Sequence, residues 1–307
     1  MNARRVIIDT DPGLDDAIAI LFALASPALS VAAITTVAGN IGLTRTTANA
    51  GRLLAATGHE AIPVAAGADR PLDGQGITEE AIHGEDGLGG VFLPEPVRAP
   101  AELPAHHLMA QLLDDHPGDC LDILALGPLT NVALLLAEFP AAARRLGRII
   151  AMGGAVEVRG NVGPRSEFNI ACDPEAAARV FASGLDVTLI PLDVTRKVRA
   201  DAVYLERLRA SGTTSGILAA DLIAAYFAGE ADRTSRPLHD PCVMLQAVRQ
   251  DLFSIRRLRL DVDCSRNEDR GTLLSSASAA EIGVAMDVDA SGALELLATT
   301  LAGTAET

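Results

Sequence analysis

Short apolar runs alternate with amphipathic segments over the first 200 residues, and this alternation is the strongest constraint on the fold. The apolar runs predict buried strands, and the segments between them carry apolar residues at helical spacing, as Ile18, Leu21 and Leu24 do. Gly58 and Asp173 stand where a helix is expected to end and to begin. Strands that alternate with helices in this way form an open, mostly parallel, Rossmann-like α/β sheet with helices on both faces. We expect strands at residues 6–8, 31–37, 62–65, 121–126, 149–152 and 187–192, and helices at residues 15–25, 43–57 and 129–138.

The pattern changes past residue 200. Helices dominate to about Tyr226, a polar loop follows, and residues 253–287 read as several strands that include a β-hairpin. Residues 67–100 are rich in glycine, proline and aspartate, which is typical of a lid or a binding loop. No repeat, low-complexity tract or linker divides the chain. We therefore expect residues 1–307 to form a single α/β domain with additional helices and a small hairpin region in its C-terminal third.

The charge and composition of the chain exclude several classes of partner. A net charge of −15 repels nucleic acid and anionic membranes, but it permits a small neutral substrate or a bound cation. No apolar run reaches the ~18 residues that a membrane span needs, and the segment before Val6 is too short for a signal peptide. The four cysteines form no C-x-x-C pair, which is typical of free thiols in a reducing compartment. We therefore expect a cytoplasmic protein that binds neither nucleic acid nor membrane.

Polar, glycine-rich segments follow four of the predicted strands. The segments at residues 9–16, 38–40, 127–131 and 153–154 each begin where a predicted strand ends. In an open parallel sheet, ligands bind outside the carboxyl ends of the strands. We therefore expect these four loops to meet at one edge of the sheet.

The first of these loops holds four carboxylates, Asp9, Asp11, Asp15 and Asp16, within eight residues. Packed together without a cation they would repel one another, and some would need raised pKa values. A divalent cation removes this repulsion, and oxygen-only ligands favour Ca²⁺ or Mg²⁺. The alternative is that Asp15 and Asp16 only cap the following helix, which explains two of the acids and not four.

The tripeptide His239-Asp240-Pro241 is a second candidate. Asp240 could be a distant ligand for the same cation, with His239 beside it as a general acid. A histidine and an aspartate before proline are also a common turn and helix start, so the tripeptide alone does not decide between the two.

Two loops carry groups that suit a sugar. In residues 160–169, the side chains of Asn161, Glu167 and Asn169 offer the donors and acceptors that a sugar diol needs, unless this segment is a polar surface loop. His83 lies in a glycine-rich segment, and it is as consistent with a solvated side chain as with a functional one.

Taken together, these segments resemble the inosine–uridine-preferring nucleoside hydrolase family. The match is specific because its motifs follow the family's order over nearly the whole chain. They lie at residues 9–16, 38–40, 83–84, 126–131, 152–154, 167–170, 191–195 and 239–241. The resemblance implies hydrolysis of the N-glycosidic bond of a ribonucleoside to ribose and a free base, through an oxocarbenium-like transition state.

The resemblance also implies a calcium centre. Asp11, Asp16, Asp240 and the backbone carbonyl of Leu126 would hold Ca²⁺, with water and the ribose 2′ and 3′ hydroxyls completing the shell. Asp11 would also take the proton from the water that attacks C1′. These roles agree with the chemistry, because a hard cation orients a diol and a carboxylate is a suitable general base.

The same resemblance implies the substrate contacts. His83 and His239 would face the base, and protonation by His239 would help the base to leave. The protein would act on a small-molecule ribonucleoside as a homo-oligomer, either a dimer or a tetramer. The expected substrate-binding residues are Asp15, Asn40, His83, Met152, Asn161, Glu167, Phe168 and Asn169.

Two rival functions stay open at this point. The segment Asp9-Thr10-Asp11 also resembles the start of an aspartate-nucleophile phosphohydrolase, which needs Mg²⁺ and a lysine, and Lys197 is the single lysine of this chain. A non-catalytic nucleoside- or sugar-binding protein would need the ribose contacts without the cation. Arg196 stands where the family often has histidine, and residues 224–236 lack the family's usual pattern. The choice between purine and pyrimidine bases therefore stays open as well.

Overall fold

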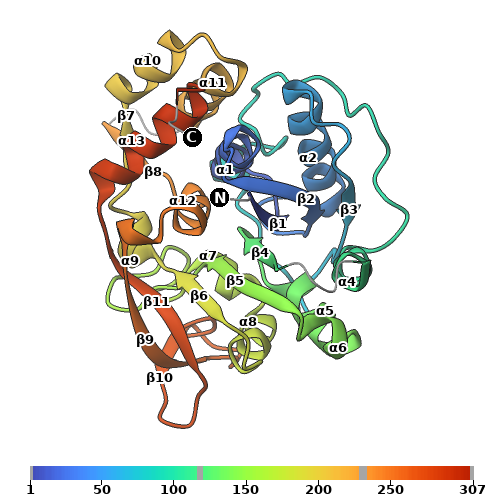
Figure 1. Ribbon diagram of the computed structural model, residues 1–307. Helices are drawn as coiled ribbons and strands as arrows, with labels where there is room; N and C mark the ends of the chain where they lie inside the picture. Colours follow the sequence, from blue (N-terminus) through green and yellow to red (C-terminus); the bar gives the residue numbers. More distant parts are fainter. Residues whose placement is uncertain (1–2, 116–119, 228–233, 305–307) are drawn as a thin grey trace.

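The computed structural model describes residues 3–115, 120–227 and 234–304, and a sheet of nine strands runs through this part of the chain (Figure 1). The strands lie in the order β10-β9-β11-β6-β5-β4-β1-β2-β3. Neighbouring strands from β11 to β3 are parallel, so their carboxyl ends share one edge. The strands are β1 (Arg4–Thr10), β2 (Leu29–Thr36), β3 (Val64–Ala66), β4 (Leu121–Ala125), β5 (Leu146–Met152), β6 (Val187–Ile190), β9 (Phe253–Val262), β10 (Leu273–Ser275) and β11 (Glu281–Val288).

Helices cover both faces of this sheet. The main ones are α1 (Leu14–Ala25), α2 (Leu43–Thr57), α4 (Ala105–Asp115), α5 (Thr130–Glu138), α8 (Pro174–Phe181), α10 (Ala202–Ala210), α11 (Thr214–Phe227), α12 (Pro241–Val248) and α13 (Ala290–Leu301). Alternate residues of β1 point to opposite faces. Val6 and Ile8 belong to the apolar cluster that includes residues of α1, α2 and α10 to α13, whereas Ile7 belongs to the cluster that includes residues of α4, α5 and α8. This burial on both faces explains why the predicted strands are continuous apolar runs.

The predicted fold class is confirmed, and so are most of the predicted elements. Helix α2 has the predicted bounds, and Gly58 ends it with a φ of 73°, a left-handed conformation that favours glycine. Asp173 caps α8 by accepting a hydrogen bond from the backbone N–H of Ala176. The strand predicted at residues 187–192 ends earlier, at Ile190, because Leu192 already begins the short helix α9 (Leu192–Thr195).

The C-terminal strands form the expected antiparallel hairpin region, and they also join the main sheet. Strand β9 pairs antiparallel with both β10 and β11, and β11 pairs parallel with β6. The hairpin region is therefore an extension of the main sheet. The predicted polar loop after Tyr226 includes residues 228–233, which lie outside the described residues. The part that follows forms β8 (Ser235–Pro237), which pairs with β7 (Arg199–Asp201).

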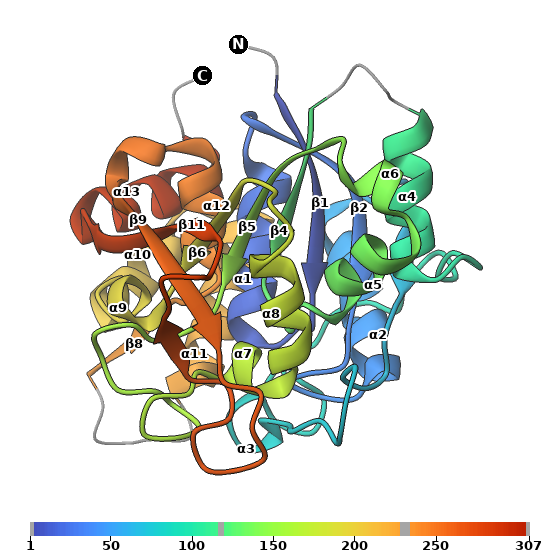
Figure 2. The ribbon, with the colours of Figure 1, turned by 90° about the horizontal axis from the view of Figure 1, so that it is seen from below.

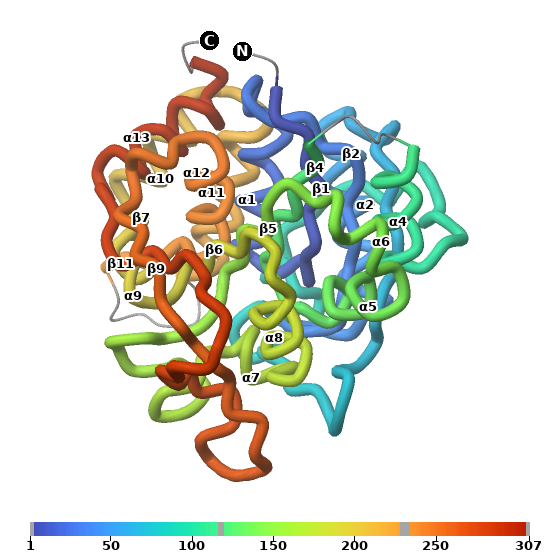
Figure 3. Tube along the Cα trace, turned by 60° about the horizontal axis from the view of Figure 1, so that its bottom comes forward, coloured from blue at the N-terminus to red at the C-terminus, as the bar shows by residue number. Residues whose placement is uncertain are grey.

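The carboxyl edge of the sheet is covered by irregular segments. In Figure 2 the arrowheads of the parallel strands point toward the side on which α3 (Glu80–His83) lies. This short helix interrupts the predicted lid segment at residues 67–100, which is otherwise mostly irregular. Figure 3 shows the start of β1 and the end of α13 at the opposite end of the molecule. Among the described residues, no helix is long and apolar enough to cross a membrane.

Candidate active site

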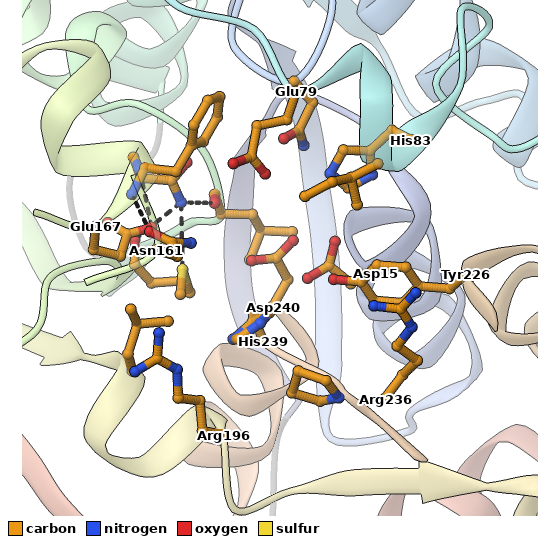
Figure 4. Close-up of a pocket in the computed structure, with 18 of the residues that line it drawn as sticks. Asp15, Glu79, His83, Asn161, Glu167, Arg196, Tyr226, Arg236, His239 and Asp240 are labelled. Carbon is orange, nitrogen blue, oxygen red and sulfur yellow. Dashed lines mark hydrogen bonds between the residues drawn. The ribbon is translucent and has the colours of Figure 1, made fainter. Parts of the chain in front are cut away.

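A cavity of about 430 Å³ opens at the carboxyl edge of the sheet (Figure 4). Its wall combines residues from α1 and from the ends of β4 and β5 with residues from α3, α7 (Phe168–Cys172), α9, α11, β7 and β8. All the predicted substrate-binding residues line it, and so do Leu126, His239 and Asp240. Asp11 and Asp16 are fully buried and do not line the cavity directly. The first two of the loops that were expected to meet at this edge contribute to the wall directly, and the other two lie behind it, where Gly127 packs against Asp11 and Gly154 donates a hydrogen bond to Glu167.

Three buried carboxylates form a group at one side of this cavity. Oxygens of Asp15, Asp16 and Asp240 all lie within 4.8 Å of one another. Asp16 is held at the start of α1, where it accepts hydrogen bonds from the Gly13 N–H at 3.0 Å and from the Thr10 hydroxyl at 2.6 Å. The group joins the first helix of the chain to α12, which begins directly after Asp240.

Asp11 lies next to this group, and the loop that follows β2 holds its side chain. One of its carboxylate oxygens, Oδ2, accepts a hydrogen bond from the Asn40 N–H at 2.7 Å. The other oxygen, Oδ1, is buried and has no hydrogen-bond partner among the described residues. Gly39 and Gly127 pack against the carboxylate so closely that a Cβ at either position would come within 2.1 or 2.2 Å of it. Only glycine fits at these two positions.

The charges of this region are poorly compensated. Burial, followed by repulsion from Asp16, raises the pKa of Asp15 to about 7. Burial and the neighbouring carboxylates also raise the pKa of Asp11 and of Asp240 well above the usual range. A hard divalent cation fits this donor set, because the donors are all oxygen and Oδ1 of Asp11 needs a partner.

Asn169 and Glu167 fix the part of the wall that lies next to the ends of β4 and β5. The Asn169 amide donates hydrogen bonds to the Leu126 carbonyl at 2.5 Å and to the Met152 carbonyl at 3.3 Å. The Glu167 carboxylate accepts from the N–H groups of Gly154, Asn169 and Ile170 at 2.8 to 3.1 Å, and it thereby caps α7. This wall is therefore fixed before any ligand binds.

The two predicted histidines also lie in the cavity wall. His83 Nδ1 accepts a hydrogen bond from the Leu14 N–H at 3.0 Å, and its ring stacks on Tyr226 with the centroids 6.2 Å apart. His239 Nδ1 lies 2.7 Å from the Thr195 hydroxyl. Burial lowers the pKa of His83 to about 4, and burial together with nearby arginines lowers the pKa of His239 to about 3. Both rings are therefore neutral near pH 7.

Several cavity residues were not found by the sequence analysis. Glu79 and Ile82 come from the lid segment, and Arg199 and Arg236 come from the paired strands β7 and β8. The Arg236 guanidinium lies 5.0 Å from the centre of the Tyr226 ring. The arginines had no sequence signal, because their positions depend on how two distant segments pair. Arg196, noted only as a departure from the family pattern, also lines the cavity, and its guanidinium donates to the carbonyls of residues 159 and 160.

Comparison with known proteins finds a family model and relatives that are all described as nucleoside hydrolases. Residues 6–295 match the family model described as inosine-uridine preferring nucleoside hydrolase. The pyrimidine-specific ribonucleoside hydrolase RihA of Citrobacter koseri is 41% identical over 98% of both chains, and that of Salmonella arizonae is 40% identical over 96% of this chain and 97% of its own.

Solved structures agree with these sequence relatives. A plant nucleoside hydrolase has a TM-score of 0.91 at 35% identity, over 97% of this chain and 98% of its own. A purine-preferring ribonucleoside hydrolase from Gardnerella vaginalis has a TM-score of 0.90 at 29% identity, over 98% of this chain and 99% of its own.

Proposed function

Because this chain belongs to the inosine–uridine-preferring nucleoside hydrolase family and is therefore an N-glycosidase of ribonucleosides, we propose that it is a calcium-dependent hydrolase that prefers pyrimidine ribonucleosides. The observation that carries the proposal is the cavity, in which a buried group of carboxylates lies beside fixed hydrogen-bonding side chains and two neutral histidines. None of the relatives reported above is named as a phosphohydrolase or as a binding protein, the two alternatives that the sequence left open.

We propose that Asp11, Asp16, Asp240 and the Leu126 carbonyl hold the calcium ion. The buried oxygen of Asp11 that has no partner among the described residues supports this assignment, and so does the short spacing between Asp16 and Asp240. When bound, calcium makes a water more acidic and orients the hydroxyls of a diol. Asp15 and Asp240 both belong to this carboxylate group and both line the cavity, and we assign Asp15 to a contact with the sugar.

The carboxylates are suited to the charge that develops on the sugar. Breaking an N-glycosidic bond leaves positive charge on the ribosyl ring. Fixed negative groups next to this ring stabilise the transition state more than the ground state. In our proposal Asp15 and Glu167 provide this stabilisation, and Asp11 accepts the proton of the water that attacks C1′.

The leaving base carries away negative charge, and His239 is placed to meet it. The Thr195 hydroxyl occupies Nδ1 of His239, which leaves Nε2 for the cavity. A neutral imidazole can act by donating its N–H to developing negative charge. We propose that His239 donates from Nε2 to the departing base.

Replacing His239 by alanine tests this role. We expect kcat for a natural ribonucleoside to fall by about 10²–10³-fold, the usual loss when one hydrogen-bond donor to developing negative charge is removed. A nitrophenyl riboside has a leaving group that needs no proton, so its hydrolysis should change little. His107→Ala, a replacement on a half-exposed surface, is the control. Equal losses on both substrates in His239→Ala would contradict the role of His239 as a donor to the leaving base.

The preference for pyrimidines rests on the relatives and has a direct test. The two RihA proteins are named as pyrimidine-specific, whereas the Gardnerella structure is named as purine-preferring. We expect kcat/KM for uridine and cytidine to exceed kcat/KM for inosine and adenosine in an assay of reducing-sugar release. Faster release from the purine nucleosides would contradict the preference without affecting the hydrolase assignment.

A further inference from the structure

Glu79 contributes a carboxylate to the active-site cavity that the sequence did not predict. It precedes α3 in the segment at residues 67–100, and in Figure 4 its carboxylate points toward the centre of the cavity. The sequence motifs of the site do not include it. The neighbouring Glu80 is exposed, so the two adjacent glutamates have different surroundings.

The backbone that carries Glu79 is fixed. Its N–H donates a hydrogen bond to the Asn40 carbonyl at 3.0 Å, and its own carbonyl accepts from the N–H groups of Ile82 and His83. The residue is therefore tied to a loop that also holds Asp11 and Asp16. The backbone of Glu79 is therefore held by the same residue, Asn40, that binds two of the proposed metal ligands.

The side chain of Glu79 lacks a donor. None of the described residues donates a hydrogen bond to its carboxylate. The titratable groups among them that interact electrostatically with it are all acids, namely Glu167, Asp15, Cys172 and Tyr226. Burial and Glu167 raise its pKa to about 7. A half-buried acceptor in such a place is costly unless a ligand supplies a donor.

We propose that Glu79 is a specificity-determining residue that accepts a hydrogen bond from the 5′-hydroxyl of the ribose. This inference rests on the proposed function, in which the 2′ and 3′ hydroxyls are directed to the cation. The 5′-hydroxyl is then the one remaining hydroxyl donor of the sugar. Glu79 interacts electrostatically with both Glu167 and Asp15. In Figure 4 it lies between Glu167 on one side of the cavity and Asp15 on the other.

A substrate–mutant cycle tests the contact. The nucleoside that the wild-type protein hydrolyses fastest is compared with its 5′-deoxy form, in the wild type and in Glu79→Ala. We expect removal of the 5′-hydroxyl to lower kcat/KM of the wild type by about 10- to 100-fold, the usual range for a hydrogen bond to a charged group. Glu79→Ala should lower kcat/KM for the full substrate by a similar factor and leave the 5′-deoxy substrate almost unchanged. Glu79→Gln, which keeps the shape of the side chain, should give an intermediate loss, and Glu80→Ala is the matched control.

The outcomes separate this inference from the proposed function. If Glu79→Ala lowers kcat/KM by the same factor on both substrates, or if the wild type does not distinguish them, Glu79 does not contact the 5′-hydroxyl, although the hydrolase assignment stands. Absence of sugar release from every nucleoside would instead contradict the proposed function.

Equilibrium binding of a ring-locked sugar without a base gives a readout that does not need turnover. With calcium present, 1,4-anhydro-D-ribitol should bind the wild type more tightly than its 5-deoxy form does. Glu79→Ala should remove this difference. Retention of the full difference in the variant would overturn the inference.

Discussion

Asp11→Asn should reduce kcat for ribonucleoside hydrolysis by at least about 10³-fold, because it removes the proposed base and one proposed ligand together. The substitution keeps the size of the side chain, which matters because Gly39 and Gly127 leave no space around it. It removes the negative charge and replaces one of the two carboxylate oxygens by an NH2 group. The loss should appear in kcat under saturating substrate and saturating calcium, measured by reducing-sugar release.

The control for this variant is Asp122→Asn. Asp122 is also fully buried on a neighbouring strand, but it pairs with Arg4 and Arg148 away from the cavity. We expect Asp122→Asn to lower the thermal stability and to leave kcat close to that of the wild type. A folded Asp11→Asn protein that retains a tenth or more of the wild-type kcat would contradict the role of Asp11.

Asp240→Asn should have two opposite effects on thermal stability. Without calcium it should raise Tm, because it removes one negative charge from a buried group in which Asp15, Asp16 and Asp11 all oppose the charge of Asp240. With calcium it should lose most of the stabilisation that the wild type gains, because a ligand that binds only the folded state stabilises it by mass action. We expect calcium affinity to fall by at least about 100-fold, since ligand charge sets the affinity of such sites.

Melting curves and calorimetric titration with calcium measure both effects. Asp287→Asn, an exposed carboxylate next to Lys197, serves as the control and should keep the wild-type calcium response. A Tm of Asp240→Asn that rises with calcium as much as the wild-type Tm does would show that Asp240 is not a ligand.

Much of this site followed from the sequence because its main residues lie where predicted strands end. Asp11, Asp16 and Asn40 follow β1 and β2, whose parallel pairing brings the two loops together. The periodicity of the strands and one rule of sheet topology were therefore enough to bring these side chains to one place. The motifs that carry the family resemblance are concentrated in such loops.

The remaining residues depend on contacts that no local pattern encodes. Glu79 belongs to a mostly irregular segment, and a backbone hydrogen bond ties it to Asn40, which is distant in the sequence. Arg236 enters the cavity because β8 pairs with β7, across more than thirty positions of chain. The parallel pairing of β11 with β6 could not be predicted for the same reason. The sequence pattern of an antiparallel pair such as β9 and β11 is the same whether the pair stands alone or extends a larger sheet.

The rate of reducing-sugar release from uridine, measured with calcium, after chelation by EDTA, and after calcium is added back in excess, tests the central claim most directly. We predict release with calcium, its loss after chelation and its recovery on addition of calcium. Release that chelation leaves unchanged would contradict the calcium centre at Asp11, Asp16 and Asp240. No release from uridine or from any other ribonucleoside would contradict the hydrolase itself.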